Sequence, residues 1–153
     1  MAINQSINIQ YPVKLFGQPT DMTCWSAATT MLFGTLFSAG PGSASLSPTG
    51  GLKADVNNIQ AFAQSYNLRL YYPQSWTVEG LIELLRRGPV ALMGPIPSLH
   101  AVVIGGIRGD GTAGSTELTI FDPWPPKRGH TYHVDYQTFM NRFPMATMYL
   151  LQR

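Results

Sequence analysis

The chain has 153 residues, a length typical of one compact domain, and its formal net charge is +2. Hydrophobic residues make up 44% and charged residues 12% of the sequence, which supplies enough apolar side chains for a core and argues against disorder. The small net charge and the lack of a Lys/Arg cluster argue against nucleic acid as a partner. We therefore expect a single domain over residues 1–153.

The cysteine count and the N-terminal sequence bear on the cellular compartment. A single cysteine excludes an internal disulfide and a multi-cysteine zinc site, and it favours a reducing compartment. The stretch "MAINQSINIQYPVKLFG" lacks the basic segment and apolar run of a signal peptide, and no run of about 18 apolar residues predicts membrane insertion. We expect a protein that is cytoplasmic in its producer, although a dedicated secretion machine could deliver it without such a signal.

Helical patterns dominate the first half of the chain. Trp25, Ala28 and Leu32 recur at helical spacing, and Asp21 or Thr23 can cap that helix. The Ser-, Gly- and Pro-rich residues 38–51 indicate a loop. The expected elements are an extended arm over Ile7–Leu15, helices over Thr23 to about Phe37 and over Asp55–Tyr66, a short strand over Leu68–Tyr72, and a helix over Thr77–Pro89 with Thr77 as its cap.

The second half of the chain has the patterns of strands separated by Gly and Pro turns. The predicted strands are "VALM", "HAVVIGGI", "ELTIF", "TYHVD" and "MATMYLLQ", and a short helix, "YQTFMNRF", precedes the last of them. The stretch "GDGTAG" indicates a hairpin loop between the second and third strands. This order predicts an α+β fold, with N-terminal helices packed on an antiparallel β-sheet.

Cys24 stands at the predicted start of the first long helix, in "GQPTDMTCWSAATTML". A cysteine attacks through its thiolate, and a helix N-terminus favours that negative charge. The free backbone N–H groups there could also hold an oxyanion, with the side-chain amide of Gln18 as a second donor. The alternatives are a buried structural cysteine and a surface amide.

His100 and Asp122 are the predicted base and orienting group for such a nucleophile. His100 begins the strand "HAVVIGGI", and Asp122 follows the next strand, "ELTIF". If Ala101 to Phe121 form a hairpin, both residues lie at the same end of it, as a nucleophile–base–carboxylate set requires. Alternatively, His100 has a purely structural role and Asp122 only forms a turn before Pro123.

Taken together, these motifs resemble the papain-like cysteine peptidases. The pattern consists of Gln-x5-Cys-Trp at a helix start, "LLRRGPVALM", "LHAVVIGGI" and "LTIFDPWPP", and it spans roughly residues 14 to 150. It is closest to compact bacterial members, namely bacteriocin-processing peptidase domains and effector proteases delivered into host cells. The resemblance implies a papain-like fold with Cys24 as nucleophile, His100 as general base and acid, Asp122 as the orienting group, and Gln18 in the oxyanion hole.

The same resemblance implies a biological role and partners. We expect a bacterial effector or toxin that hydrolyses peptide bonds of a protein in a target cell, and a toxic protease implies a neutralising immunity protein. The alternatives are an amidase, deamidase or acyltransferase on the same triad, and a non-catalytic binding module that keeps the fold. No cofactor is expected. His130 and His133 do not predict a metal site, because residues three apart on a strand point to opposite faces.

Overall fold

An antiparallel sheet of seven strands with four helices organises the part of the chain that the computed structural model describes: residues 6–17, 24–34, 56–95, 99–143 and 147–153. The helices are α1 (Cys24–Phe33), α2 (Val56–Ser65), α3 (Val78–Leu85) and α4 (Tyr136–Arg142). The strands are β1 (Ile7–Gln10), β2 (Arg69–Tyr71), β3 (Val90–Pro95), β4 (Leu99–Gly109), β5 (Thr116–Asp122), β6 (His130–Asp135) and β7 (Tyr149–Gln152). The prediction of an α+β fold with an antiparallel sheet is confirmed.

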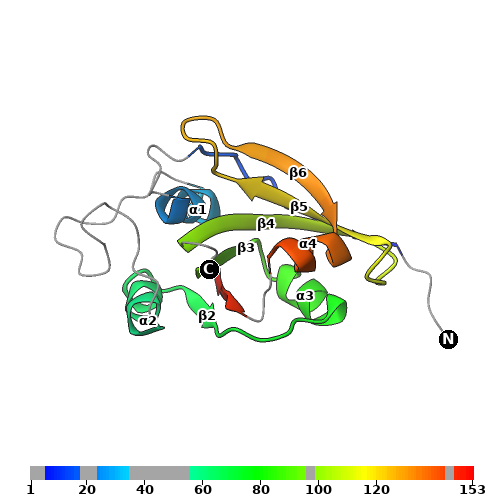
Figure 1. Cartoon of the computed structure of the whole chain (residues 1–153), viewed down its shortest axis with the longest axis horizontal. Helices are drawn as coiled ribbons and strands as arrows, with labels where there is room; N and C mark the ends of the chain where they lie inside the picture. Colours follow the sequence, from blue (N-terminus) through cyan, green and yellow to red (C-terminus); the bar gives the residue numbers. More distant parts are fainter. Residues whose placement is uncertain (1–5, 18–23, 35–55, 96–98, 144–146) are drawn as a thin grey trace.

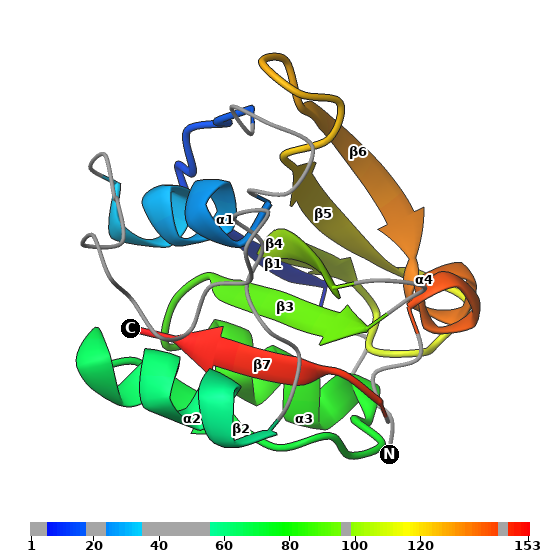
Figure 2. The same ribbon diagram turned by 60° about the vertical axis from the view of Figure 1, so that its left-hand side comes forward.

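The strands follow the order β2-β7-β3-β4-β5-β6, and β1 pairs with β4 beside this path. Figure 1 shows the long strands β4, β5 and β6 side by side, and Figure 2 shows β7 next to β3 on the other side of β4. The hairpin of β4 and β5 is therefore central, and the two predicted site residues on it lie within the sheet rather than in separate loops.

Alternating side chains divide the core between the two faces of the sheet. Val90 and Leu92 of β3 pack with α3 and α4, whereas Ala91 and Met93 pack with α1 and α2. This period of two is the geometry of a strand buried on both faces. The helix that begins at Cys24 and the helix pair α3–α4 therefore cover opposite faces.

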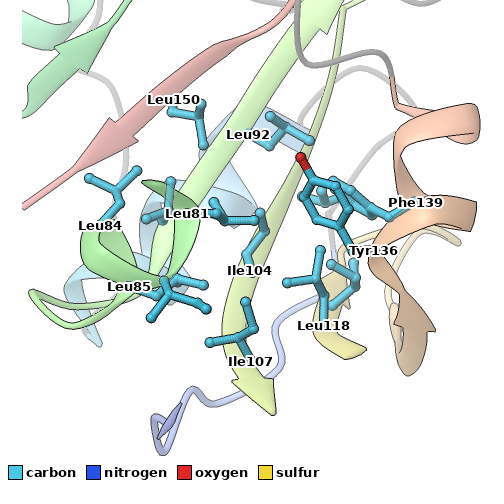
Figure 3. Packing of buried hydrophobic residues seen from close by; sticks show 14 of the residues in the cluster. Leu81, Leu84, Leu85, Leu92, Ile104, Ile107, Leu118, Tyr136, Phe139 and Leu150 are labelled. Carbon is cyan, nitrogen blue, oxygen red and sulfur yellow. The ribbon is translucent and has the colours of Figure 1, made fainter. Parts of the chain in front are cut away.

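Leucines from α3 form much of the larger core. Figure 3 shows Leu81, Leu84 and Leu85 pointing toward Leu92 and Ile104 in the sheet. The predicted inward positions of α3 are thus confirmed, and so is its cap, since the Thr77 hydroxyl accepts a hydrogen bond from the Gly80 N–H at 3.0 Å.

A β-bulge interrupts the pairing of β4 with β5 between Ile104 and Gly106. A Cβ atom at Gly105 would lie 2.4 Å from the ring of Phe121, so only glycine lets that ring lie against the backbone of β4. Phe121 directly precedes Asp122, and the bulge thereby helps to fix the end of β5.

Several predicted elements are shorter in the structure. The arm forms a strand only over Ile7–Gln10, and the nearby Pro12 disfavours a longer strand. Helix α1 ends at Phe33 because Gly34 takes a left-handed φ of 73°. The last strand begins at Tyr149. The predicted caps Asp21 and Thr23 and the predicted loop 38–51 lie outside the described residues.

Asp135 makes the stability of α4 dependent on pH. Its side chain accepts hydrogen bonds from the Thr138 N–H at 2.9 Å and from the Thr138 hydroxyl at 2.7 Å, and these bonds lower the pKa of Asp135 from its ordinary value of 3.8. A lowered folded-state pKa stabilises the fold above pH 3.8, and this contribution is lost as the pH falls through the folded-state pKa.

Asp135→Asn keeps a capping side chain but loses the charge. We therefore expect its unfolding free energy to decrease less than that of the wild type as the pH is lowered. Urea unfolding of both proteins between pH 7 and pH 2 measures this, because the difference in unfolding free energy should shrink below about pH 4. A difference that stays constant down to pH 2 would contradict the assignment of the lowered pKa to Asp135.

Candidate active site

Cys24 is the first residue of α1 and is 4% exposed. It belongs to a buried cluster that includes Met93 of β3 and Ala101 and Val103 of β4. The predicted position of Cys24 at a helix start is confirmed. Gln18 lies outside the described residues.

The β4–β5 hairpin brings the other two predicted residues to the same end of the sheet. His100 is the second residue of β4, where its Cα atom is paired with Gly94, and Asp122 is the last residue of β5. Since Val103 is the partner of Phe121, one further step of the ladder puts Asp122 opposite Val102, two residues from His100. Only the backbone of His100 is described.

The sequence neighbours of these residues share the cluster that contains Cys24. Ala101 follows His100 and is fully buried in this cluster, and Phe121 precedes Asp122 and packs against it. The start of α1, the start of β4 and the end of β5 therefore meet around one group of apolar side chains.

Asp122 is fixed by the turn that follows it. Its side chain is buried, at 7% exposure, and Oδ1 accepts a hydrogen bond from the Trp124 N–H at 2.9 Å. The Trp124 carbonyl oxygen is in turn 2.8 Å from Nδ1 of His130, the residue paired with Asp122 on β6. Burial and the charge of Asp122 raise the pKa of Tyr132 to about 12, so the Tyr132 hydroxyl stays neutral near this carboxylate. The turn thus holds the carboxylate in one orientation.

Two glycines bring the N-terminal arm into backbone contact with this turn. A Cβ atom at Gly17 would lie 2.4 Å from the Arg128 nitrogen, and a Cβ atom at Gly129 would lie 2.7 Å from the Asp122 carbonyl oxygen and 3.2 Å from Leu15. Residues 15–17, which lead directly into Gln18, therefore pack on the turn that leaves Asp122. We call this contact the Gly17 seam.

A family model described as the papain-like cysteine protease AvrRpt2 matches residues 3–141. This stretch contains Gln18, Cys24, His100 and Asp122 in the order that the sequence analysis expected. The chain belongs to this family of papain-like cysteine proteases. It is thus a member of a cysteine peptidase family, as the sequence predicted. Neither the curated proteins nor the solved structures compared with it gave a match.

The two remaining histidines have separate partners. Nδ1 of His133 is 3.1 Å from the Thr119 hydroxyl and 3.7 Å from Glu117. His130, three residues earlier on β6, instead contacts the Trp124 carbonyl oxygen. Within the described ranges, no three His, Cys, Asp or Glu side chains gather as metal ligands would. Nor does any described helix have the length and apolar character needed to cross a membrane.

The sequence analysis missed the Gly17 seam and the contact of His130 with Trp124. The sequence signal for the seam was a glycine directly before Gln18, but a single glycine does not reveal which backbone approaches it. His130 was considered only as a metal ligand. Its role in the turn depends on the pairing of β6 with β5, which no local pattern encodes.

Gly17→Ala is expected to lower kcat of the peptidase by roughly 10- to 100-fold and to change KM little, because displacement of reacting groups by about 1 Å costs that much. The added methyl group would lie 2.4 Å from the Arg128 nitrogen, so the arm, which leads to the proposed oxyanion donor Gln18, must shift. The measurement is kcat and KM on a peptide substrate, together with the affinity for a peptide aldehyde, whose thiol adduct needs the oxyanion donors.

Gly114→Ala is the matched control, since a Cβ atom at Gly114 meets nothing within 4 Å. It should leave kcat and aldehyde affinity unchanged. Equal kcat values for Gly17→Ala and Gly114→Ala would show that the seam does not position the site.

Proposed function

We propose that residues 1–153 form one peptidase domain in which Cys24, His100 and Asp122 are the catalytic triad. The Cys24 thiolate attacks the carbonyl carbon of a peptide bond, and the backbone N–H of Cys24 and the Gln18 amide hold the resulting oxyanion. Protonated His100 gives its proton to the leaving amine, and a thioester remains. Water, deprotonated by His100, then hydrolyses the thioester and regenerates the thiol group. Asp122 orients the imidazole throughout.

One observation carries the proposal: the start of α1 packs against the hairpin end where β4 begins and β5 ends. Cys24 shares a buried cluster with Ala101, and Phe121 packs on it, so the residues adjacent to His100 and Asp122 lie around the sulfur-bearing residue. Membership of a cysteine peptidase family supports the same roles. The fixed orientation of Asp122 in its turn suits an orienting group.

The test is a comparison of new protein termini. A cell extract is incubated with the wild-type protein or with Cys24→Ala, and the newly formed α-amino groups are labelled and identified. We expect termini that appear only with the wild type. Identical sets of termini from the two proteins would refute peptide-bond hydrolysis by Cys24.

We further propose that the protein is a bacterial effector or toxin that acts on a protein inside a target cell, and that an immunity protein neutralises it in the producer. The match to the family of AvrRpt2 supports this role. Expression inside cells should arrest growth, and Cys24→Ala should not. Co-expression of the neighbouring gene product should restore growth, whereas normal growth with the active protein alone would refute the toxin role.

A further inference from the structure

We propose that Lys127 and Arg128, on the turn that follows Asp122, form a basic rim that selects substrates with acidic residues near the cleaved bond. This inference rests on the proposed function and names the substrate class of the same site. It is carried by the unpaired positive charge of the turn and by the contact of the turn with the arm that leads to Gln18.

No carboxylate of the described residues neutralises the charge on this rim. Lys127, Arg128 and the arm residue Lys14 are exposed, and none of them lies within 4.0 Å of a carboxylate oxygen of the described residues. The arm 7–17 and the turn 123–129 contain no acidic residue. Asp122 is buried and does not face solvent. The rim and Lys14 of the arm therefore present three positive charges to a bound peptide.

The Gly17 seam places this charge beside the proposed active site. Gly17 would clash with the backbone of Lys127 and Arg128 if it carried a Cβ atom, and it directly precedes Gln18. Lys127 and Arg128 also follow Asp122 by only five and six positions. We therefore expect a peptide bound at the proposed oxyanion donors to pass close to both cations.

The turn holds these residues in one backbone arrangement. The Arg128 and Gly129 N–H groups both donate to the Pro125 carbonyl oxygen, at 3.2 and 2.8 Å. Lys127 takes a left-handed φ of 66°, which glycine or asparagine adopts at a lower cost. Lys127 thus holds a backbone conformation that is uncommon for lysine, in a turn fixed by these two hydrogen bonds.

The expected size of the effect follows from exposed ion pairs. Such a pair contributes up to about 1 kcal/mol, which corresponds to a preference of about fivefold per charge. Because surface charges are screened by salt, the preference should also weaken as the ionic strength rises from about 0.01 M to 1 M.

The test uses a peptide library prepared from a proteome with chymotrypsin. Wild type, Lys127→Gln/Arg128→Gln and Lys127→Glu/Arg128→Glu are each incubated with it, and the residues flanking every cleaved bond are counted. Arg69→Gln/Arg87→Gln is the matched control, since it removes two exposed positive charges from β2 and from the end of α3. The folding of each variant is checked by its thermal unfolding.

We expect Asp and Glu to be enriched near the bonds cleaved by the wild type and by the Arg69/Arg87 control. The enrichment should disappear in the Gln variant, and Lys and Arg should replace it in the Glu variant. Cleavage without acidic enrichment, or enrichment that charge reversal leaves intact, would overturn the inference while the proposed peptidase function stands. No cleavage that depends on Cys24 would refute both.

Discussion

Cys24→Ala is expected to reduce kcat/KM for peptide cleavage by at least about 10⁴-fold, because it removes the atom that forms the thioester. The remaining groups can still bind a peptide and polarise its carbonyl, but water is then the only nucleophile. The measurement is the rate of cleavage of a peptide identified from the termini experiment. The variant should still bind that peptide, with a dissociation constant close to the KM of the wild type.

The fold should tolerate this substitution. Cys24 is buried at 4% exposure, but its side chain exceeds that of alanine by one atom, so the cost is about 1 kcal/mol. Circular dichroism and thermal unfolding should therefore show a folded variant. A folded Cys24→Ala protein that cleaves at more than about a tenth of the wild-type rate would contradict the assignment of the nucleophile, since triad removals cost orders of magnitude.

Asp122→Asn is expected to reduce kcat by roughly 10²- to 10⁴-fold, although many papain-like peptidases have asparagine in this role. The reason lies in the turn, where the Trp124 N–H requires an acceptor at Oδ1. An asparagine that keeps its oxygen there must direct its NH₂ group toward the proposed position of the imidazole. It then presents a donor where the His100 N–H needs an acceptor. The opposite rotamer leaves the Trp124 N–H facing a donor.

The pH profile distinguishes this account from general damage to the fold. Orientation of His100 by Asp122 predicts that Asp122→Asn changes kcat and the acidic limb of the kcat profile while thermal stability changes little. Thr119→Val is a comparison variant on the same strand, since its hydroxyl lies 3.1 Å from His133 and away from the turn. It should keep the wild-type profile. Equal kcat values for Asp122→Asn and the wild type would contradict the proposed role.

Much of the fold could be predicted from the sequence because local periodicity reports burial. The leucines of α3 recur at helical spacing and are all buried, and the apolar runs of β3 and β4 match strands covered on both faces. The predicted end of α1, at about Phe37, is too late, because the left-handed Gly34 ends the helix.

The candidate site was predictable only in part. The hairpin argument anticipated that His100 and Asp122 lie at one end of β4 and β5, because antiparallel pairing follows from chain order and turn position. Contacts between distant backbones were not predictable. The approach of Gly17 to Arg128 depends on how the arm packs on the turn, and the contact of His130 with the Trp124 carbonyl oxygen depends on the pairing of β6 with β5.

The rate at which iodoacetamide alkylates Cys24 at pH 6.5, in the wild type and in His100→Ala, tests the central claim most directly. The proposed activation of Cys24 by His100 predicts rapid alkylation of the wild type at this pH and at least about tenfold slower alkylation of the variant. Equally slow alkylation of both proteins, with both folded, would contradict a nucleophile activated by His100.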